Sequence, residues 1–163
     1  MKPKVMAGNN MKLQLSPQKI VKDHLTVWHE HGSEVDIVMD LKNLTFAPDS
    51  IESLCAFHVA DHFFEDETRK AFKNWYECLK QNGTLYVVVD NFELIARKFV
   101  GGDINISMIN ERFSHPMQFT KDNLILFLSE AGFIDHEMRI WYADIPEMFT
   151  KGEYDFVIAA KKI

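Results

Sequence analysis

Residues 66–90, DETRKAFKNWYECLKQNGTLYVVVD, decide the fold class of this chain. In the first part of the stretch, Ala71, Phe72 and Trp75 recur at helical spacing behind an acidic opening. Residues 84–90 are apolar in their middle and end in an aspartate, as expected of a buried strand. A helix followed by such a strand is typical of an α/β sheet with mainly parallel strands.

Segments with strand-like and helix-like patterns alternate along the rest of the chain. We expect further strands at residues 4–7, 24–30, 34–41 and 53–59. We expect helices that begin at Ser16 and Pro17, cover 92–99, and run from Thr120 to Gly132. The last two β-rich stretches, 134–145 and 153–163, have no helix between them and should pair antiparallel. The expected fold is one α/β domain, residues 1–163, with a Rossmann-like mainly parallel sheet flanked by helices.

Composition narrows the range of functions. The chain has 163 residues and a formal net charge of -6, which works against binding of a nucleic acid because that binding depends on neutralising phosphates. No apolar stretch approaches membrane-spanning length, so we expect no membrane partner. Cys55 and Cys78 both fall in expected core elements, so a disulfide framework is not indicated and a cytoplasmic location is the expectation.

Residues 55–63, CAFHVADHF, raise the question of a metal site because they contain Cys55, His58 and His62. Zinc needs its ligands within tetrahedral reach of one another. On a strand, Cys55 and His58 are an odd number of residues apart and point to opposite faces. No second Cys/His pair completes the set, so we expect no metal site here.

Three segments together resemble a known family. VDIVMDLKNLTFAPDSIESLCAFHVADHF (35–63) is similar to the middle of class I S-adenosylmethionine-dependent methyltransferases of the small type 11 kind. WYECLKQNGTLYVVVDN (75–91) looks like the family's helix, turn and fifth strand, and HPMQFTKDNLILFLSEAGF (115–133) like its late segment. The segments occur in the family's order.

The resemblance implies S-adenosylmethionine as cofactor and assigns its contacts. Gly8 would stand for the family's glycine-rich loop, and Glu30 for the acidic residue that holds the ribose hydroxyls. Asp40 and the backbone N–H of Leu41 would contact adenine, and His58 would lie at the end of the fourth strand beside the pocket. A strand-ending aspartate that binds its own turn is an equally good interpretation of Asp40.

The resemblance also suggests the catalytic side chains. His62, after the fourth strand, and His115, in the long segment 101–119, are the candidates to take a proton from an attacking group. A structural role for His62, bracing the next helix, is the alternative. The acidity of the chain disfavours a nucleic acid as methyl acceptor, so a small molecule or another non-nucleic-acid acceptor is expected.

The chain departs from the family at its start, where Gly8 is the only glycine before Gly32. Two other functions therefore remain open. One is an inactive methyltransferase-like module that has lost the cofactor and acts in binding or assembly, for example as a homodimer. The other is a nucleotide-dependent Rossmann-like enzyme, which the absence of a GxGxxG motif disfavours.

Overall fold

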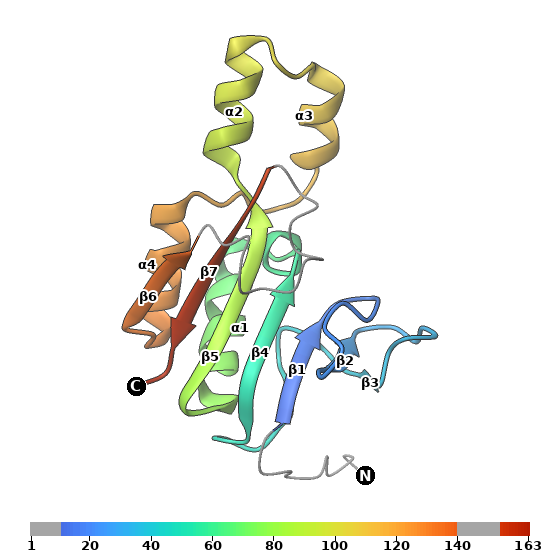
Figure 1. The fold of residues 1–163 in the computed structure, drawn as a ribbon, viewed down its shortest axis with the longest axis vertical. Coiled ribbons are helices and arrows are strands. Elements are labelled where there is room, and N and C mark those ends of the chain that lie inside the picture. Colours follow the sequence, from blue (N-terminus) through green and yellow to red (C-terminus); the bar gives the residue numbers. More distant parts are fainter. Residues whose placement is uncertain (1–10, 140–153) are drawn as a thin grey trace.

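The computed structural model describes residues 11–139 and 154–163, so the predictions at residues 4–7 and 140–145 lie outside it. Within the described residues, the strands form one sheet in the order β3-β2-β1-β4-β5-β7-β6 (Figure 1). The strands are β1 (Met11–Leu15), β2 (Leu25–Trp28), β3 (Ile37–Val38), β4 (Ile51–Phe57), β5 (Leu79–Asp90), β6 (Asp135–Arg139) and β7 (Asp155–Lys161).

The direction of the strands confirms the predicted fold class. Strands β1 to β5 run parallel to their neighbours, whereas β7 pairs antiparallel with both β5 and β6. Because β2, β3, β4 and β5 are parallel, their carboxyl ends meet at one edge of the sheet, where ligands bind in open α/β folds.

Two helices, α1 (Glu65–Cys78) and α4 (Lys121–Ala131), pack side by side on one face of the sheet (Figure 1). They bury Phe72, Trp75 and Leu128 against the strands. The predicted limits of α4 are confirmed, since the Thr120 hydroxyl accepts from Asn123 N–H and Gly132 ends the helix at a φ of 112°. No helix in the described part of the chain has the length and apolarity to cross a membrane.

Gly83 follows the helical pattern of residues 66–79 in the sequence, a position typical of a helix stop, but in the structure it allows two strands to approach closely. Helix α1 ends at Cys78, and Gly83 lies within β5. A Cβ atom there would sit 2.8 Å from the carbonyl oxygen of Lys80 and 3.2 Å from that of Glu52. The glycine therefore permits a close approach of the two backbone segments at the start of the β4–β5 pair.

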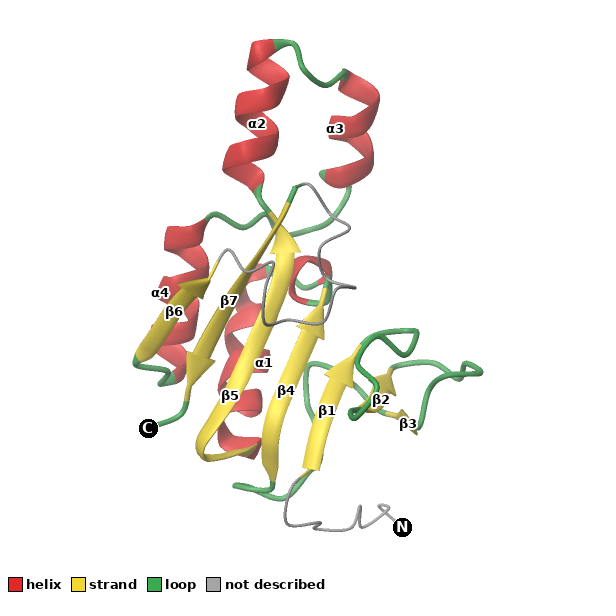
Figure 2. Cartoon of the chain, viewed as in Figure 1, coloured by secondary structure: helices red, strands yellow, loops and turns green. Residues whose placement is uncertain are grey.

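In the described part of the chain, no helix packs on the opposite face of the sheet. Residues 16–24, where we predicted a helix, form bends and a turn (Figure 2), so that prediction is wrong. The reason is the buried Gln14 side chain, whose oxygen accepts from Ile20 N–H and Val21 N–H and so competes with helical hydrogen bonds. Ile20 and Val21 then pack on a small cluster that contains Cys55 and Val88.

The segment after β5 forms a projecting arm of two helices, α2 (Phe92–Gly101) and α3 (Ile106–Arg112), at the carboxyl end of the sheet (Figure 1). Helix α2 was predicted, whereas α3 was not. Phe92 N–H donates to the carbonyl oxygen of Phe119 at 3.1 Å, which closes the base of the arm. The chain therefore returns to the sheet where it left it, and brings residues 112–117 over the ends of β4 and β5.

Candidate functional site

The residues expected to contact adenosine lie beyond the ends of β2 and β3. Glu30 is exposed, two residues past the end of β2, with an oxygen 3.6 Å from His29 Nε2. Asp40 is exposed past the end of β3, and its carboxylate accepts from Lys42 N–H at 3.0 Å. The local turn anticipated as an alternative for Asp40 is therefore present.

Leu41, next to Asp40, is anchored to the core. Its side chain is buried, and its carbonyl oxygen accepts from the indole N–H of Trp75 at 2.8 Å. Because Trp75 is fully buried on α1, this bond fixes the backbone of the turn that carries Asp40. Gly8, the remaining predicted residue of the cofactor loop, lies outside the described residues.

His58 ends β4 in a left-handed backbone conformation, with a φ of 46°. Such a conformation is uncommon for a residue other than glycine and costs free energy, so other contacts must hold it. His58 N–H donates to the carbonyl oxygen of Val88 at 2.9 Å, and its Nε2 lies 3.2 Å from Asp155 Oδ2. These contacts turn the His58 ring toward the carboxyl ends of β5 and the start of β7.

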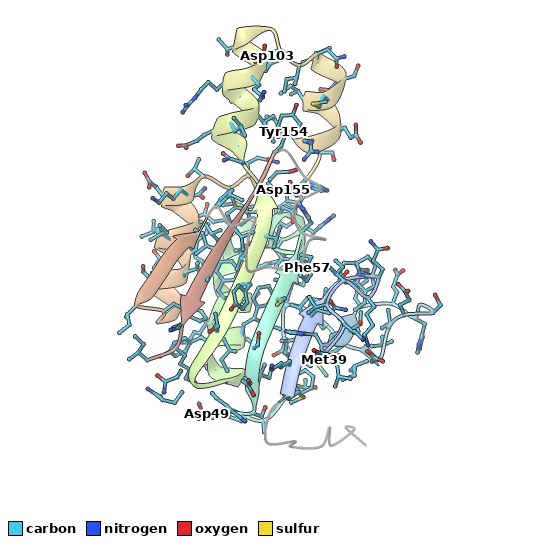
Figure 3. The ribbon with its side chains drawn as sticks, in the orientation of Figure 1. Met39, Asp49, Phe57, Asp103, Tyr154 and Asp155 are labelled. Atoms are coloured by element: carbon cyan, nitrogen blue, oxygen red, sulfur yellow. The ribbon has the colours of Figure 1, made fainter. Side chains whose placement is uncertain are left out.

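A charged cluster surrounds His58 at this edge. Asp90, the last residue of β5, is the register partner of Asp155 in β7. Arg112 of α3 pairs with Asp90 and lies 3.6 Å from Asp155 Oδ1. Its guanidinium also lies 5.0 Å from the ring centre of Tyr154, which precedes Asp155 where β7 begins (Figure 3). The arm thus supplies the cation that balances the buried carboxylate of Asp90 and the largely buried carboxylate of Asp155.

The pKa values in this cluster follow from burial and charge. Burial raises the pKa of Asp90, although Arg112 and His58 oppose the change. Burial also acts to raise the pKa of Asp155, but the hydrogen bond and charge of His58 lower it overall. For His58, burial is outweighed by the carboxylates of Asp155, Asp61 and Asp90, so the pKa is raised.

A second cluster contains the two predicted catalytic histidines. His62 lies in a short 3-10 helix, η1 (Ala60–His62), and its ring centre is 4.2 Å from that of His115. His115 Nδ1 lies 3.2 Å from the buried carboxylate of Asp61. The structure therefore brings together His62 and His115, which are far apart in the sequence.

His62 lies close enough to the end of β2 for His29 to affect its pKa. Partial desolvation lowers the pKa of His62, and the charges of His115, His58 and His29 lower it further against the opposing effect of the Asp61 carboxylate. His29 precedes Glu30, so the adenosine-side residues and the two histidines share the same edge of the sheet. An imidazole with a lowered pKa is neutral near pH 7 and can accept a proton.

Sequence reasoning missed Asp155 as part of this edge. Asp155 comes to lie opposite Asp90 through the register of β7 against β5, for which the sequence holds no local signal. The Cys55 Sγ atom, by contrast, lies 3.7 Å from His24 Nε2, and Cys55 belongs to neither of the side-chain groups that contain His58 and His62. Burial raises the pKa of Cys55 to about 12, so it is an inert thiol.

The fit of this edge to S-adenosylmethionine differs between the two halves of the cofactor. Two exposed carboxylates, Glu30 and Asp40, follow β2 and β3, as ribose and adenine recognition requires. The β1–β2 connection, residues 16–24, contains no glycine, and the buried Ser16 accepts from Gln18 N–H at 3.3 Å. The adenosine half therefore fits the residues present, while the methionine half would meet a serine-proline turn.

Comparison with known proteins agrees with this arrangement. Residues 10–87, which include β1 to β4 and most of β5, match the family described as methyltransferase domain. Solved structures of methyltransferases share the fold of most of this chain. The chain has the fold of a class I methyltransferase. The resemblance seen in the sequence, including its Rossmann-like sheet, is confirmed.

Three solved structures illustrate the likeness. A Thermotoga maritima protein, described as an S-adenosylmethionine-dependent methyltransferase and possible histamine N-methyltransferase, is 16% identical with a TM-score of 0.55 over 79% of this chain and 65% of its own. A candidate methyltransferase from Bacillus halodurans is 16% identical, with a TM-score of 0.58 over 98% of this chain and 94% of its own.

The third is human N-acetylserotonin methyltransferase in complex with S-adenosylmethionine, 14% identical, with a TM-score of 0.58 over 86% of this chain. The present chain covers only 41% of that enzyme's length. No curated protein matches the sequence. At these identities the structural likeness establishes the fold of this class I methyltransferase-like chain.

Proposed function

We propose that the chain is an S-adenosylmethionine-dependent methyltransferase that acts on a small-molecule acceptor. The observation that carries the proposal is the position of the family match. Residues 10–87 include the strands whose carboxyl ends present Glu30, Asp40 and His58 at one edge. The bound cofactor would supply an electrophilic methyl group on its sulfonium.

The residues at this edge divide into two roles. Glu30 would accept hydrogen bonds from the ribose hydroxyls, and Asp40 with Leu41 N–H would hold adenine. His62 and His115 would face the acceptor, where a neutral imidazole can take the proton of an attacking hydroxyl or amine. Methyl transfer depends mainly on alignment, which contributes up to about 7–11 kcal/mol in favourable systems, so few side chains need to react.

The net charge of the chain and the groups around the proposed acceptor side support a small acceptor. The net charge of -6 disfavours a nucleic acid acceptor. Arg112 of the arm pairs with Asp90 at the end of β5, and His115 lies beside Asp61, which follows β4. Groups from the arm and from the sheet would therefore line the acceptor side. Free, buried Cys55 and Cys78 suit the reducing cytoplasm, which is the proposed location.

Calorimetry with S-adenosylmethionine and S-adenosylhomocysteine tests the proposal. A ligand at one hundred times its dissociation constant should stabilise the fold by about 2.7 kcal/mol. Asp40→Ala should weaken binding at least about tenfold, which corresponds to 1.4 kcal/mol, and leave the fold intact. Asp103→Ala, at the exposed end of the arm (Figure 3), is the matched control and should bind like the parent chain.

The second candidate function is an inactive methyltransferase-like module that has lost the cofactor. The glycine-free connection between β1 and β2 favours it, because a side chain there opposes close approach of a ligand to the backbone. Leu25 and Val38, 41% and 40% exposed on β2 and β3, would then offer an apolar edge to a second copy of the chain. Absence of heat and of any thermal shift at millimolar ligand would replace the enzyme proposal with this one.

A further inference from the structure

Asp61, His62 and His115 form a group of side chains that can hold a metal ion. One ligand atom from each lies within 4.8 Å of the others. Met117 N–H donates to the carbonyl oxygen of Asp61 at 3.1 Å, so the loop that carries His115 is fixed to η1 by its backbone. The three donors are therefore held together by two segments that are distant in sequence.

Among the residues that the structure describes, the buried Asp61 carboxylate has no hydrogen-bond partner. Its side chain is 4% exposed, and neither oxygen has a hydrogen bond to any residue that the structure describes. The ring nitrogens His115 Nδ1 and His58 Nδ1 lie 3.2 Å and 4.0 Å from Oδ2, without hydrogen-bond geometry. An uncompensated buried carboxylate costs several kcal/mol, which a bound cation would offset.

The spacing of the donors suits a small divalent ion. Two atoms bound at about 2.1 Å to a tetrahedral ion are about 3.4 Å apart, close to the 3.2 Å between His115 Nδ1 and Asp61 Oδ2. His62 is exposed and His115 is 27% exposed in its side chain, so an ion could enter from solvent. Three protein donors leave a coordination position open for water or another ligand.

A neighbouring group, His58, Asp90 and Asp155, satisfies the same distance criterion but is a poorer site. Arg112 pairs with Asp90 and approaches Asp155, so its permanent positive charge already occupies that cluster and repels a second cation. No lysine or arginine is paired with Asp61 in the described part of the chain. The two clusters are therefore distinguished by charge.

We propose that Asp61, His62 and His115 bind a divalent first-row transition metal ion such as Zn²⁺. Two imidazoles and one carboxylate are a donor set that these ions prefer. The site departs from the sequence-based expectation of no metal, because His115 joins the group only through the fold. Binding of the ion is independent of methyl transfer, and a role for it at the acceptor rests on the proposed function. The ion would coordinate the acceptor's oxygen or nitrogen and lower its pKa, and the proton would pass to solvent water because the histidines are then metal ligands.

Titration calorimetry of the chelator-treated protein with zinc chloride tests the site. We expect one ion per chain, and at least about 100-fold weaker binding in His62→Gln and in His115→Gln. His31→Gln is the matched control, since His31 is an exposed histidine outside both clusters. Cobalt(II) should give visible absorption bands of a low-coordinate site in the parent chain and in His31→Gln only.

Three results would overturn the site: no stoichiometric binding, equal weakening in His31→Gln, or unchanged binding in His62→Gln and His115→Gln. Circular dichroism of each variant establishes that it is folded, and exposed His62 is a position where substitution should not unfold the chain. S-adenosylhomocysteine binding is measured separately on metal-free protein. Zinc binding without cofactor binding would overturn only the methyltransferase proposal, and the reverse result only the metal site.

Discussion

Asp90 and Asp155 lie directly opposite each other in the antiparallel pair of β5 and β7, and Arg112 contacts both. Like charges facing each other across a ladder destabilise a sheet. The chain tolerates them because His58 and Arg112 approach from two other elements. The closing strands and the arm are therefore coupled through one cluster at the edge of the sheet.

Loss of the arm's cation should weaken this coupling. Arg112→Gln is expected to lower the free energy of unfolding at neutral pH by about 1–3 kcal/mol, because the facing carboxylates lose their main partner. Adding Asp155→Asn to Arg112→Gln removes one of the two like charges and should recover part of the loss. Urea unfolding of the two variants measures both effects. Equal stability of Arg112→Gln and the parent chain would show that the cluster is not coupled in this way.

The close approach at Gly83 gives a test of the β4–β5 connection. Gly83→Ala places a Cβ atom 2.8 Å from a backbone carbonyl oxygen and should cost about 1–3 kcal/mol. Gly101→Ala is the matched control, because the nearest atom to its Cβ is 3.9 Å away and the residue is helical. Thermal unfolding should separate the two variants. A Gly83→Ala protein as stable as Gly101→Ala would contradict the packing described here.

The bond from Trp75 to Leu41 predicts that α1 positions the turn beyond β3. Trp75→Phe leaves the Leu41 carbonyl oxygen without its donor, and we expect a loss of about 1–3 kcal/mol of stability. If Asp40 and Leu41 hold adenine, binding of S-adenosylhomocysteine should weaken as well. Phe72→Leu is the control, since Phe72 is equally buried on α1 and makes no such bond. It should lose stability but keep its affinity per folded molecule.

His24 predicts a loss of stability on acidification. Burial, followed by the charge of Lys12, lowers the pKa of His24 below 6.5, and its buried Nδ1 atom has no hydrogen-bond partner among the described residues. The unfolded chain therefore takes up a proton that the folded chain resists. Stability is complete above about pH 6.5 and falls as the pH decreases through the folded pKa.

Urea unfolding measures this effect at pH values between about 7.5 and about 5. This range spans the usual pKa of histidine, about 6.5. His24→Gln cannot take up the proton and should show a shallower decline than the parent chain. His31→Gln, which removes an exposed histidine, should decline as the parent does. Parallel curves for all three proteins would remove His24 as the cause.

Much of the sheet could be predicted because its strands are short, apolar and separated by strong stop signals. Residues 84–90 and the cap pair Thr120 and Gly132 are positions where local pattern and final structure agree. The helix expected at Ser16 failed because Gln14, a buried side chain of the preceding strand, binds the backbone that the helix would have used. Such a competition depends on a side chain's position in space.

The polar edge was predictable in part. His58 and Asp90 each follow an apolar run, so their place at the end of a strand could be inferred, and His62 follows in the loop after the same strand as His58. Asp155 and the contact between Asp61 and His115 could not, because they depend on the register of β7 and on the return path of the arm. Long-range pairing of this kind leaves no local periodicity in the sequence.

The hydrogen bond between Phe92 and Phe119 has a consequence for how such a chain could diversify. Because this bond holds the two ends of the arm next to each other, a different segment could replace the arm without changing the order of the strands in the sheet. Because Arg112 and His115 travel with it, each exchange would replace half of the polar edge at once. For the proposed methyltransferase, replacement of this one segment would change the acceptor preference, while the strands that present Glu30 and Asp40 stay as they are.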